Sequence, residues 1–287
     1  MIGNLPRDDS TAWPAALPRR RTPPLWRDLD EVPPGHGPCV VTIGVFDGVH
    51  RGHRHLIDRA VSIGRERDLP TVLMTFDPHP ARVLGIDRDT AALSTIERRA
   101  ELVAELGIDA ICVLRFTPAL AALSAHNFAE RILSQTLHAE AVVVGANFTF
   151  GARGAGNLDT LRDLGERYGF TTAGVGLLEA VDTTTCSSTY TRRCVRTGDL
   201  PEATRTLGRP HRVDGYLHCG VLTVAPNTSL PPPGTYTGTV DTHPAVIEVT
   251  EHQTLHLHDT TSADEQFRAV SVAFHSQLDL PAPTSII

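Results

Sequence analysis

The sequence predicts an α/β fold in which a parallel sheet domain is followed by a smaller antiparallel β domain. Between residues 40 and 168, short apolar runs alternate with longer segments whose apolar residues recur at helical spacing. Strands separated by such helices pair in parallel, and the helices cover both faces of the sheet. Beyond residue 211 the sequence changes to short alternating segments between turns rich in Pro, Gly, Asn and Thr, which is typical of an antiparallel sheet or small barrel.

The composition is ordinary for a globular protein and narrows the range of partners. The 287 residues are 41% hydrophobic and 21% charged, with a formal net charge of −7, and this length favours two domains. A negative charge argues against general nucleic-acid binding, and no apolar run is long enough to span a bilayer. The five scattered cysteines form no CxxC pair, which indicates reduced thiols and not a disulfide framework or a metal site. We therefore expect a cytoplasmic protein without nucleic-acid or membrane partners; a homo-oligomer is among the states that the sequence allows.

Three regions are expected along the chain. Residues 1–24 are rich in Pro, Arg and Asp without periodicity and predict a disordered extension. The sheet domain is expected over residues 25–208, with strands at Val40–Ile43, Thr71–Thr75, Ala110–Leu114 and Ala141–Val144 and helices at His50–Glu66, Ser94–Leu106, Ser124–Leu137 and Leu158–Tyr168. The β domain is expected over residues 209–287, with strands at Arg212–Leu217, Val221–Val224, Thr235–Val240, Ala245–Val249, Thr254–His258 and Ala269–Phe274.

The most informative stretch is Gly44–His53, which reads GVFDGVHRGH between an apolar strand and a helical pattern. Its three glycines have no Cβ to block a close approach, and the N-terminus of the helix supplies unpaired N–H groups and a partial positive charge. His50 and His53 are three residues apart, so both point to the same side of the first helical turn, where an imidazole N–H can donate to a phosphate. The stretch therefore predicts a nucleotide site in which His50 and His53 face the bound anion, with Gly44, Phe46, Asp47, Gly48 and Gly52 in the binding loop.

Two further segments carry groups suited to phosphate or to an aromatic ligand. Asn147 follows an expected strand and can donate and accept at once. Phe148 and Phe150 alternate, so one should face the ligand edge, although core packing of both is an equally good interpretation. The hydroxyl residues Ser187–Thr189 suit a helix N-cap. They also suit a second anion site in which Arg192 lies over the leaving group with its planar, permanently charged fork.

The motifs resemble those of known enzymes. Gly-x-Phe-Asp-Gly-x-His-x-Gly-His resembles the signature of the HxGH nucleotidyltransferase superfamily, whose members transfer a nucleoside monophosphate from a triphosphate and release pyrophosphate. It is followed in order by Thr75–Pro80, Phe116–Ser124, Val144–Gly151, Ser187–Arg192 and Leu207–His211. This series resembles the bacterial bifunctional riboflavin kinase/FAD synthetase family from about Trp26 to Gly215. The resemblance implies a Rossmann-like FMN adenylyltransferase domain followed by a β-barrel riboflavin kinase domain.

The resemblance also implies a role for each matching residue. As catalytic residues, His50 and His53 would contact the ATP phosphates and stabilise the charge that develops in transfer, and Asn147 would hold phosphate or the attacking FMN phosphate in line. Ser188, Thr189 and the catalytic Arg192 would bind the departing pyrophosphate with Mg²⁺, and Ser187 would belong to the nucleotide-binding residues. The isoalloxazine ring of FMN or FAD would lie against Pro78, Pro80, Phe148 and Phe150. The FMN phosphate is itself a nucleophile, so the reaction needs positioning and electrostatic stabilisation and no covalent enzyme intermediate.

The C-terminal part departs from the kinase pattern. The family has a glycine-rich run into Pro-Thr-Ala-Asn, whereas this sequence has Cys219–Asn227, which keeps only Asn227. Thr254 stands where the resemblance implies the catalytic glutamate. The domain is short for a kinase barrel and is expected to lack the closing C-terminal helix. We therefore expect no riboflavin kinase activity.

Three functions remain open on the sequence. An FMN adenylyltransferase that makes FAD is the leading hypothesis, since its phosphate-binding residues are complete. A nucleotidyltransferase acting on a flavin analogue or another phosphorylated metabolite is the second, and pyrophosphate release with different acceptors would separate the two. A flavin or nucleotide sensor without turnover is the third, and it predicts tight binding without product.

Overall fold

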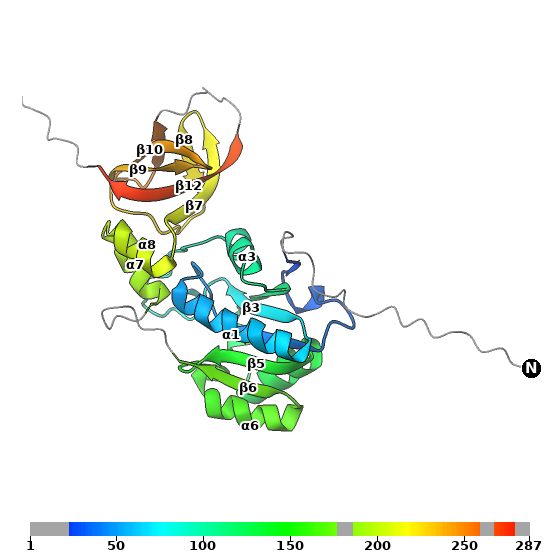
Figure 1. Cartoon of the computed structure of the whole chain (residues 1–287). Helices are drawn as coiled ribbons and strands as arrows, with labels where there is room; N and C mark the ends of the chain where they lie inside the picture. Colours follow the sequence, from blue (N-terminus) through cyan, green and yellow to red (C-terminus); the bar gives the residue numbers. More distant parts are fainter. Residues whose placement is uncertain (1–22, 177–185, 259–266, 279–287) are drawn as a thin grey trace, which may run out of the picture. The chain divides into compact units, whose positions relative to one another are not determined.

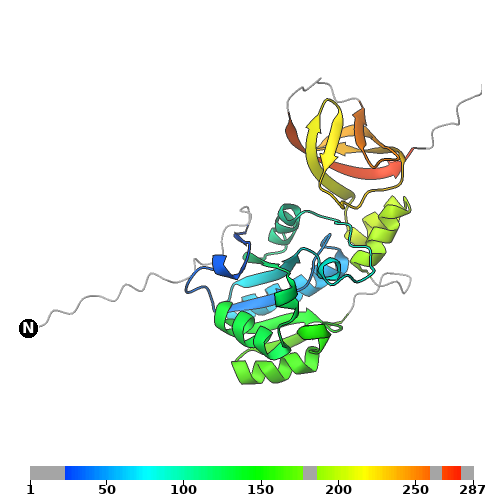
Figure 2. The ribbon, with the colours of Figure 1, turned by 180° about the vertical axis from the view of Figure 1, so that it is seen from behind.

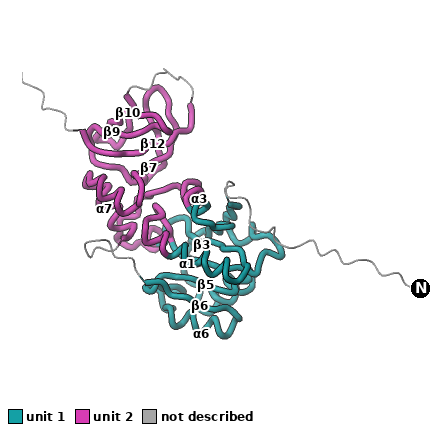
Figure 3. Tube along the Cα trace, viewed as in Figure 1, with its two compact units in different colours: residues 1–44, 56–80, 103–176 teal, residues 45–55, 81–102, 177–287 magenta. Residues whose placement is uncertain are grey.

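The computed structural model describes residues 23–176, 186–258 and 267–278 (Figure 1). The chain divides into two compact units, one formed by residues 1–44, 56–80 and 103–176 and the other by residues 45–55, 81–102 and 177–287 (Figure 3). Units defined by contacts need not coincide with domains, and the boundary expected between residues 208 and 209 stays a prediction.

The first unit is built on a parallel sheet of six strands in the order β1-β4-β3-β2-β5-β6. The strands are β1 (Leu25–Trp26), β2 (Cys39–Ile43), β3 (Thr71–Asp77), β4 (Ala110–Arg115), β5 (Ala139–Gly145) and β6 (Thr171–Val175). The parallel sheet and its central strands were predicted. The sequence analysis missed the two edge strands because β1 has only two residues and β6 is half-exposed and lacks an apolar run.

Helices pack on both faces of this sheet (Figures 1 and 2). Alternate strand residues such as Val41 and Met74 share a core with Ile132 and Leu161 on one face, whereas α1 covers the other face with an apolar stripe that begins at Leu56. The helices in the described residues are η1 (Leu29–Glu31), α1 (Arg51–Arg67), α2 (Pro80–Val83), α3 (Ile96–Ala104), α4 (Pro118–Ala121), α5 (Ala125–Asn127), η2 (Phe128–Thr136), η3 (Ala152–Gly154), α6 (Leu158–Tyr168), α7 (Ser188–Arg196) and α8 (Leu200–Leu207). No helix in the described part of the chain is long and apolar enough to cross a membrane.

The helix expected at Ser124–Leu137 forms with an unexpected geometry. From Phe128 to Thr136 it is a π-helix, in which N–H groups bond to carbonyls five residues back, as Leu137 N does to Ile132 O at 3.0 Å. The pattern of apolar residues does not distinguish this winding from an α-helix. Its buried residues pack in the core that it shares with the sheet.

The strand order indicates where along the sheet a ligand is expected to bind. The chain runs from β2 through β3 to β4 toward one edge, and from β5 to β6 toward the other. In open α/β sheets ligands bind at such a switch point, beyond the carboxyl ends of the two central strands. Here those strands are β2 and β5, which end at Ile43 and Gly145. The two segments singled out by sequence, Gly44–His53 and Asn147–Phe150, leave the sheet there.

The second unit contains a closed antiparallel barrel in the order β10-β11-β8-β7-β12-β9. Its strands are β7 (His211–His218), β8 (Val221–Val224), β9 (Gly234–Val240), β10 (His243–Val249), β11 (Leu255–His258) and β12 (Arg268–Gln277). All the expected β segments form strands, and the barrel closes in spite of its short sequence. Closure requires Gly238, because a Cβ there would lie 2.1 Å from Ala273 O. Aliphatic side chains together with Tyr236 and Phe274 fill the interior.

Candidate functional site

The loop after β2 adopts a constrained backbone. Phe46, Gly48 and Val49 have φ angles of 52°, 76° and 40°, which lie in the left-handed region. This region is unfavourable for a β-branched residue such as Val49, so the surrounding contacts must hold the loop in place. Gly48 cannot be replaced without strain, since a Cβ there would lie 3.0 Å from the Cβ of Leu93. We call residues Gly44–His50 the phosphate loop.

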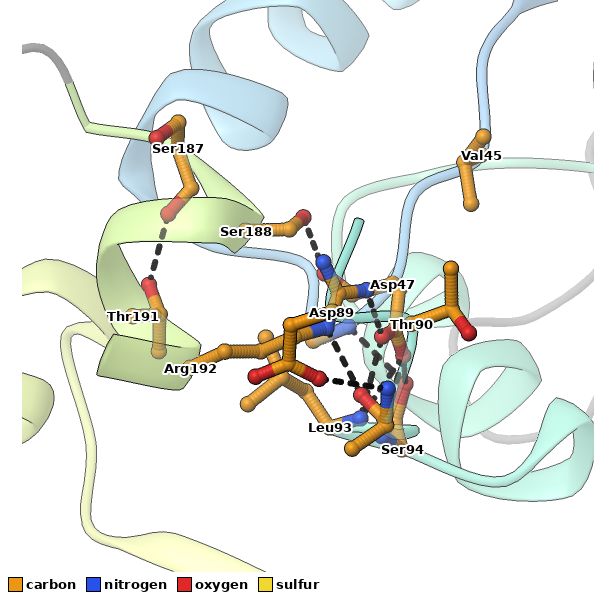
Figure 4. Close-up of polar contacts among 12 residues, drawn as sticks. Val45, Asp47, Asp89, Thr90, Leu93, Ser94, Ser187, Ser188, Thr191 and Arg192 are labelled. Atoms are coloured by element: carbon orange, nitrogen blue, oxygen red, sulfur yellow. Dashed lines mark hydrogen bonds and ion pairs between the residues drawn. The ribbon is translucent and has the colours of Figure 1, made fainter. Parts of the chain in front are cut away.

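A buried ion pair network holds the phosphate loop (Figure 4). The Asp47 side chain is 2% exposed and Arg192 is 1% exposed, and Arg192 Nη2 donates to Asp47 Oδ2 at 2.6 Å. Arg99 Nη2 donates to Asp47 Oδ1 at 3.2 Å, and the backbone N–H groups of Leu93 and Ser94 also donate to this carboxylate at 3.0–3.1 Å. We call these residues the Asp47 cluster. Both oxygens of the Asp47 carboxylate thus accept hydrogen bonds from protein donors.

The Asp47 cluster also fixes the start of α7. Arg192 lies on this helix and donates through Nε to Ala91 O at 2.7 Å, and Ser188 Oγ donates to Asp47 O at 3.0 Å (Figure 4). Burial by itself would raise the pKa of Asp47, but Arg99, Arg192 and the hydrogen bond from Leu93 together hold the pKa below its ordinary value. The carboxylate is therefore charged at neutral pH.

The two histidines of the HxGH motif lie against each other as neutral rings. Their centroids are 3.6 Å apart with 21° between the planes, and His50 Nδ1 accepts the backbone N–H of His53 at 3.2 Å. Burial lowers the pKa of His50 to about 4, and burial beside His50 and the nearby arginines lowers the pKa of His53 well below its ordinary value. Since Nδ1 of His50 is an acceptor, its proton lies on Nε2, which can donate to a ligand. Phe46, fully buried, supports His53 by an edge contact at 5.2 Å.

The N-termini of two helices meet beside these histidines. α1 begins at Arg51 and α7 at Ser188, and a Cβ on Gly52 would lie 2.9 Å from Cys186 O, so the two chain segments are in contact there. The first N–H groups of a helix have no partner within the helix and attract anions. Arg209 adds a positive charge, with its guanidinium bonded to the carbonyls of Gly48 and Val49. Neutral imidazole donors, two helix N-termini and an arginine together suit a polyphosphate.

The neutral state of His50 gives a testable pH dependence. Its pKa is about 4 in the fold and 6.5 as an ordinary histidine, so the unfolded chain takes up the proton first as the pH falls. Stability should therefore decrease between about pH 6.5 and pH 4, by roughly 3 kcal/mol for this residue. Denaturant unfolding across this range measures the effect. His50→Asn keeps an acceptor without a titrating group and should remove that part of the slope; an unchanged slope would contradict the assignment.

The predicted flavin-binding residues and Asn147 lie in the first unit, and each is placed by its own strand. Asn147 is exposed just beyond β5. Phe148 is half-buried and stacks on Phe150 with ring centroids 5.5 Å apart. Pro78, which is exposed, follows β3, and Pro80 opens α2. Pro78, Pro80, Asn147 and Phe148 therefore keep accessible surface at the carboxyl edge of the sheet.

Several residues predicted to contact ligand make contacts within the protein. Asp47 and Arg192 neutralise each other in the interior, so the prediction that Arg192 lies over the leaving group is not what this geometry shows. Phe150 is 7% exposed and packs on Phe128, so it supports Phe148 from the core side. The side chains of two further predicted binding residues also contact protein groups, namely Phe46 against His53 and Ser187 as the N-cap that accepts from Tyr190 N. Thr189 stays exposed on the first turn of α7.

Sequence reasoning missed three residues that hold the site. Ser94 accepts the N–H of Gly48 at 2.9 Å, and Arg99 donates to Val45 O at 2.8 Å as well as to Asp47. Both lie on a segment that carried no motif. Arg209 lies within the Leu207–His211 motif, but no role was predicted for Arg209 itself. Ser94 and Arg99 bond to residues far away in the sequence, and such contacts leave no local sequence pattern. Only Arg209, which lies in a motif, could have been predicted as a site residue.

No group of three or more His, Cys, Asp or Glu side chains arranged for a metal ion occurs in residues 23–176, 186–258 and 267–278. Each of the five cysteines carries a free thiol. The Asp47 carboxylate, the acidic group of the phosphate loop, is fully used by protein donors and does not fit a role as a cation ligand.

Comparison with known proteins identifies the same region. The model of the family described as FAD synthetase matches residues 32–190, which is more than half of the chain. The match contains the phosphate loop, the accessible residues after β3 and β5, and the first turn of α7.

Curated relatives extend this similarity. The bifunctional riboflavin kinase/FMN adenylyltransferase of Escherichia coli K12 is 36% identical over 179 residues, which cover 62% of this chain and 57% of the relative. The proteins of the same description from Pseudomonas fluorescens and Bacillus subtilis are 35% and 34% identical, over 67% and 62% of this chain and 61% and 56% of the relatives. The chain thus matches less than two thirds of the length of each.

A solved structure resembles nearly the whole chain. It is described as a macrolide-efflux protein from Streptococcus pneumoniae, and it aligns with a TM-score of 0.78 over 93% of this chain and 94% of its own at 22% identity. At this identity the likeness concerns the fold alone, and it extends to the parallel sheet and the barrel.

Proposed function

The chain belongs to the FAD synthetase family, a family of nucleotidyltransferases, and we propose on this basis that it transfers AMP from ATP to FMN and releases FAD and pyrophosphate. The observation that carries the proposal is the meeting of two helix N-termini with two stacked, neutral histidines in one compact unit. This arrangement offers many neutral donors to a polyphosphate. It follows β2, the strand at which the sheet order reverses.

The proposed reaction is an in-line substitution at the α-phosphorus of ATP. A phosphate oxygen of FMN forms the new P–O bond, and the bond to the bridging oxygen breaks, so that pyrophosphate leaves with the electron pair. Such a reaction depends on positioning and on stabilising the charge that develops on the phosphate oxygens. Mg²⁺ enters with ATP as part of the substrate. The residues of the protein hold the phosphates and donate hydrogen bonds.

His50 and His53 take the central place in this proposal. Each is neutral at pH 7 and donates through a ring N–H, so neither has to lose or gain a proton during transfer. The N–H groups at the start of α7, together with Ser188 and the exposed Thr189, hold the leaving pyrophosphate. Arg192 acts through Asp47 by fixing the shape of the phosphate loop.

The acceptor is proposed to lie at the ends of β3 and β5. Phe148 offers an aromatic face backed by Phe150, and Pro78 and Pro80 offer flat apolar surface suited to the isoalloxazine ring. Asn147 is exposed and can hold the acceptor phosphate through its amide.

The direct experiment incubates the purified chain with FMN, ATP and Mg²⁺ and follows FAD and pyrophosphate by chromatography. FAD formation in proportion to pyrophosphate supports the proposal. Pyrophosphate release only with a different phosphorylated acceptor would move the assignment to another substrate. Binding of FMN and ATP without any product would make the chain a sensor and overturn the enzymatic proposal.

We further propose that the chain does not phosphorylate riboflavin. The stretch between β7 and β8 is a tight turn at Cys219–Gly220 in place of a glycine-rich phosphate loop. Thr254, in the turn before β11, has a hydroxyl at the position where the resemblance implies the catalytic glutamate of a kinase. The barrel interior is filled by side chains. Incubation with riboflavin, ATP and Mg²⁺ should give no FMN above a protein-free control; measurable FMN would contradict this prediction.

A further inference from the structure

A short segment connects the phosphate loop to the barrel within the second unit. We call Ala91–Ser94 the strap. The N–H groups of its last two residues donate to the Asp47 carboxylate, and its first carbonyl accepts from Arg192 Nε at 2.7 Å. The side chain of its third residue packs over Gly48. The position of the strap therefore determines where the donors of the Asp47 cluster lie.

The strap is also bonded to the loop between β8 and β9, residues 225–233, which we call the barrel loop. Ala92 N donates to Asn227 O at 2.6 Å, and Ala92 O accepts the N–H of Ser229 at 2.9 Å. Ala92 thus pairs with Thr228 as an isolated parallel bridge. Leu93 and Ser94 of the strap bond to Asp47 in the phosphate loop, and Ala92, the residue before them, bonds to the barrel loop. A displacement of the barrel loop would displace the donors to Asp47.

The barrel loop is in turn fixed by His211 at the start of β7. His211 is 1% exposed, and its Nε2 donates to Ser229 O at 2.7 Å. Nδ1 is buried and has no hydrogen-bond partner among the described residues, so the ring is neutral with its proton on Nε2. The ring also lies parallel to Phe274 of the barrel core, with centroids 6.2 Å apart. One buried donor therefore joins the barrel core to the loop that holds the strap.

We propose that the barrel serves the transfer reaction as a positioning element, with His211 as its key residue. The path runs from His211 through the backbone of Ser229 and Ala92 to the Asp47 cluster and the phosphate loop. The path consists of hydrogen bonds between His211, Ser229, Ala92 and Asp47 and of the peptide backbone of the strap, so the barrel can act without contacting the ligand itself. The inference rests on the proposed function for its catalytic consequence, but the coupling itself is a property of the fold.

Amide hydrogen exchange tests the coupling without reference to activity. His211→Phe keeps a ring against Phe274 and removes the donor, whereas His211→Gln places an amide N–H near the position of Nε2. We expect about tenfold faster exchange at the amides of Leu93 and Ser94 in His211→Phe, with β9 and β10 unchanged, and recovery in His211→Gln. His252→Phe, at an exposed histidine in the turn after β10, should leave the strap as in the unaltered chain.

Two exchange results would overturn the inference. Strap amides that exchange at the unaltered rate in His211→Phe would show that the barrel loop does not hold the strap. Faster exchange spread over the whole barrel, with no recovery in His211→Gln, would show a role in barrel stability only. If His211→Phe fails to fold, Ala92→Pro removes the N–H that donates to Asn227, although its ring also restricts φ at residue 92, and it tests the coupling from the strap side.

Kinetics then test the catalytic consequence. In FAD synthesis we expect His211→Phe to lower kcat about tenfold with the KM for FMN unchanged, and His211→Gln to restore kcat. A fall in KM and kcat together, or no recovery, would contradict a positioning role. If the unaltered chain makes no FAD, the proposed function fails, while the exchange experiment still decides the coupling.

Discussion

His53→Ala should lower the rate of FAD formation by roughly a hundred- to a thousand-fold, the typical cost of losing one donor to a developing negative charge. His53 stacks on His50 and is held at its other side by Phe46, so its ring is already oriented before a substrate binds. Removing it deletes a preorganised donor and leaves the helix N-terminus. Steady-state kinetics with FMN and MgATP measure the loss.

The control for this prediction is His55→Ala. His55 lies on the same helix and is exposed, so its removal should leave the rate within about twofold and the melting temperature unchanged. His53→Ala should also retain a cooperative thermal transition, because His53 contributes little to the core. Full activity in His53→Ala, with the protein folded, would exclude the histidine from the transfer step.

Asp47→Asn should be the most destabilising single change in the phosphate loop. The substitution leaves Arg99 and Arg192 as buried charges without their counter-ion, and breaking one partner of a buried pair costs about 3–5 kcal/mol. Denaturant unfolding measures this loss, and FAD formation should fall with it because the loop is no longer held. Adding Arg192→Met should recover part of the stability, since the second substitution removes one unpaired charge.

A surface pair gives the matched control. Arg162 and Asp159 are 2.7 Å apart, as close as the Asp47 pair, but their side chains are 51% and 81% exposed. Asp159→Asn should change the free energy of unfolding by less than about 1 kcal/mol. Equal effects of Asp47→Asn and Asp159→Asn would contradict the assignment of the Asp47 cluster as the support of the loop.

The sequence was sufficient for the architecture where local pattern and tertiary environment agree. Apolar runs such as Val40–Ile43 are buried on both faces, as a parallel strand requires, and Leu158–Tyr168 begins at an Asn cap and ends at a left-handed glycine, so both ends of the helix were correctly predicted. β6 was not predicted as a strand because it lies at the edge of the sheet, is partly exposed and has no run of apolar residues.

The sequence predicts where the candidate site lies but not its internal connections. The glycines and histidines of Gly44–His53 predict a phosphate loop, and Ser187 was predicted as a helix N-cap, which it forms at the start of α7. The pairing of Asp47 with Arg192 was not predictable, because two charged residues in separate motifs suit a ligand as well as they suit each other. Only the fold shows that both are buried.

The pairing of Asp47 with Arg192 also affects the order in which contacts can form while the chain is being synthesised. Arg192 follows Asp47 by 145 residues, which a ribosome takes about seven to thirty seconds to add. Sheet strands can pair as they emerge, and Arg99 follows Asp47 by only 52 residues, whereas the bond from Arg192 to Asp47 waits for α7. The Asp47 cluster is therefore completed late, and a chain released before α7 would have its sheet strands without the bond that joins the loop after β2 to α7.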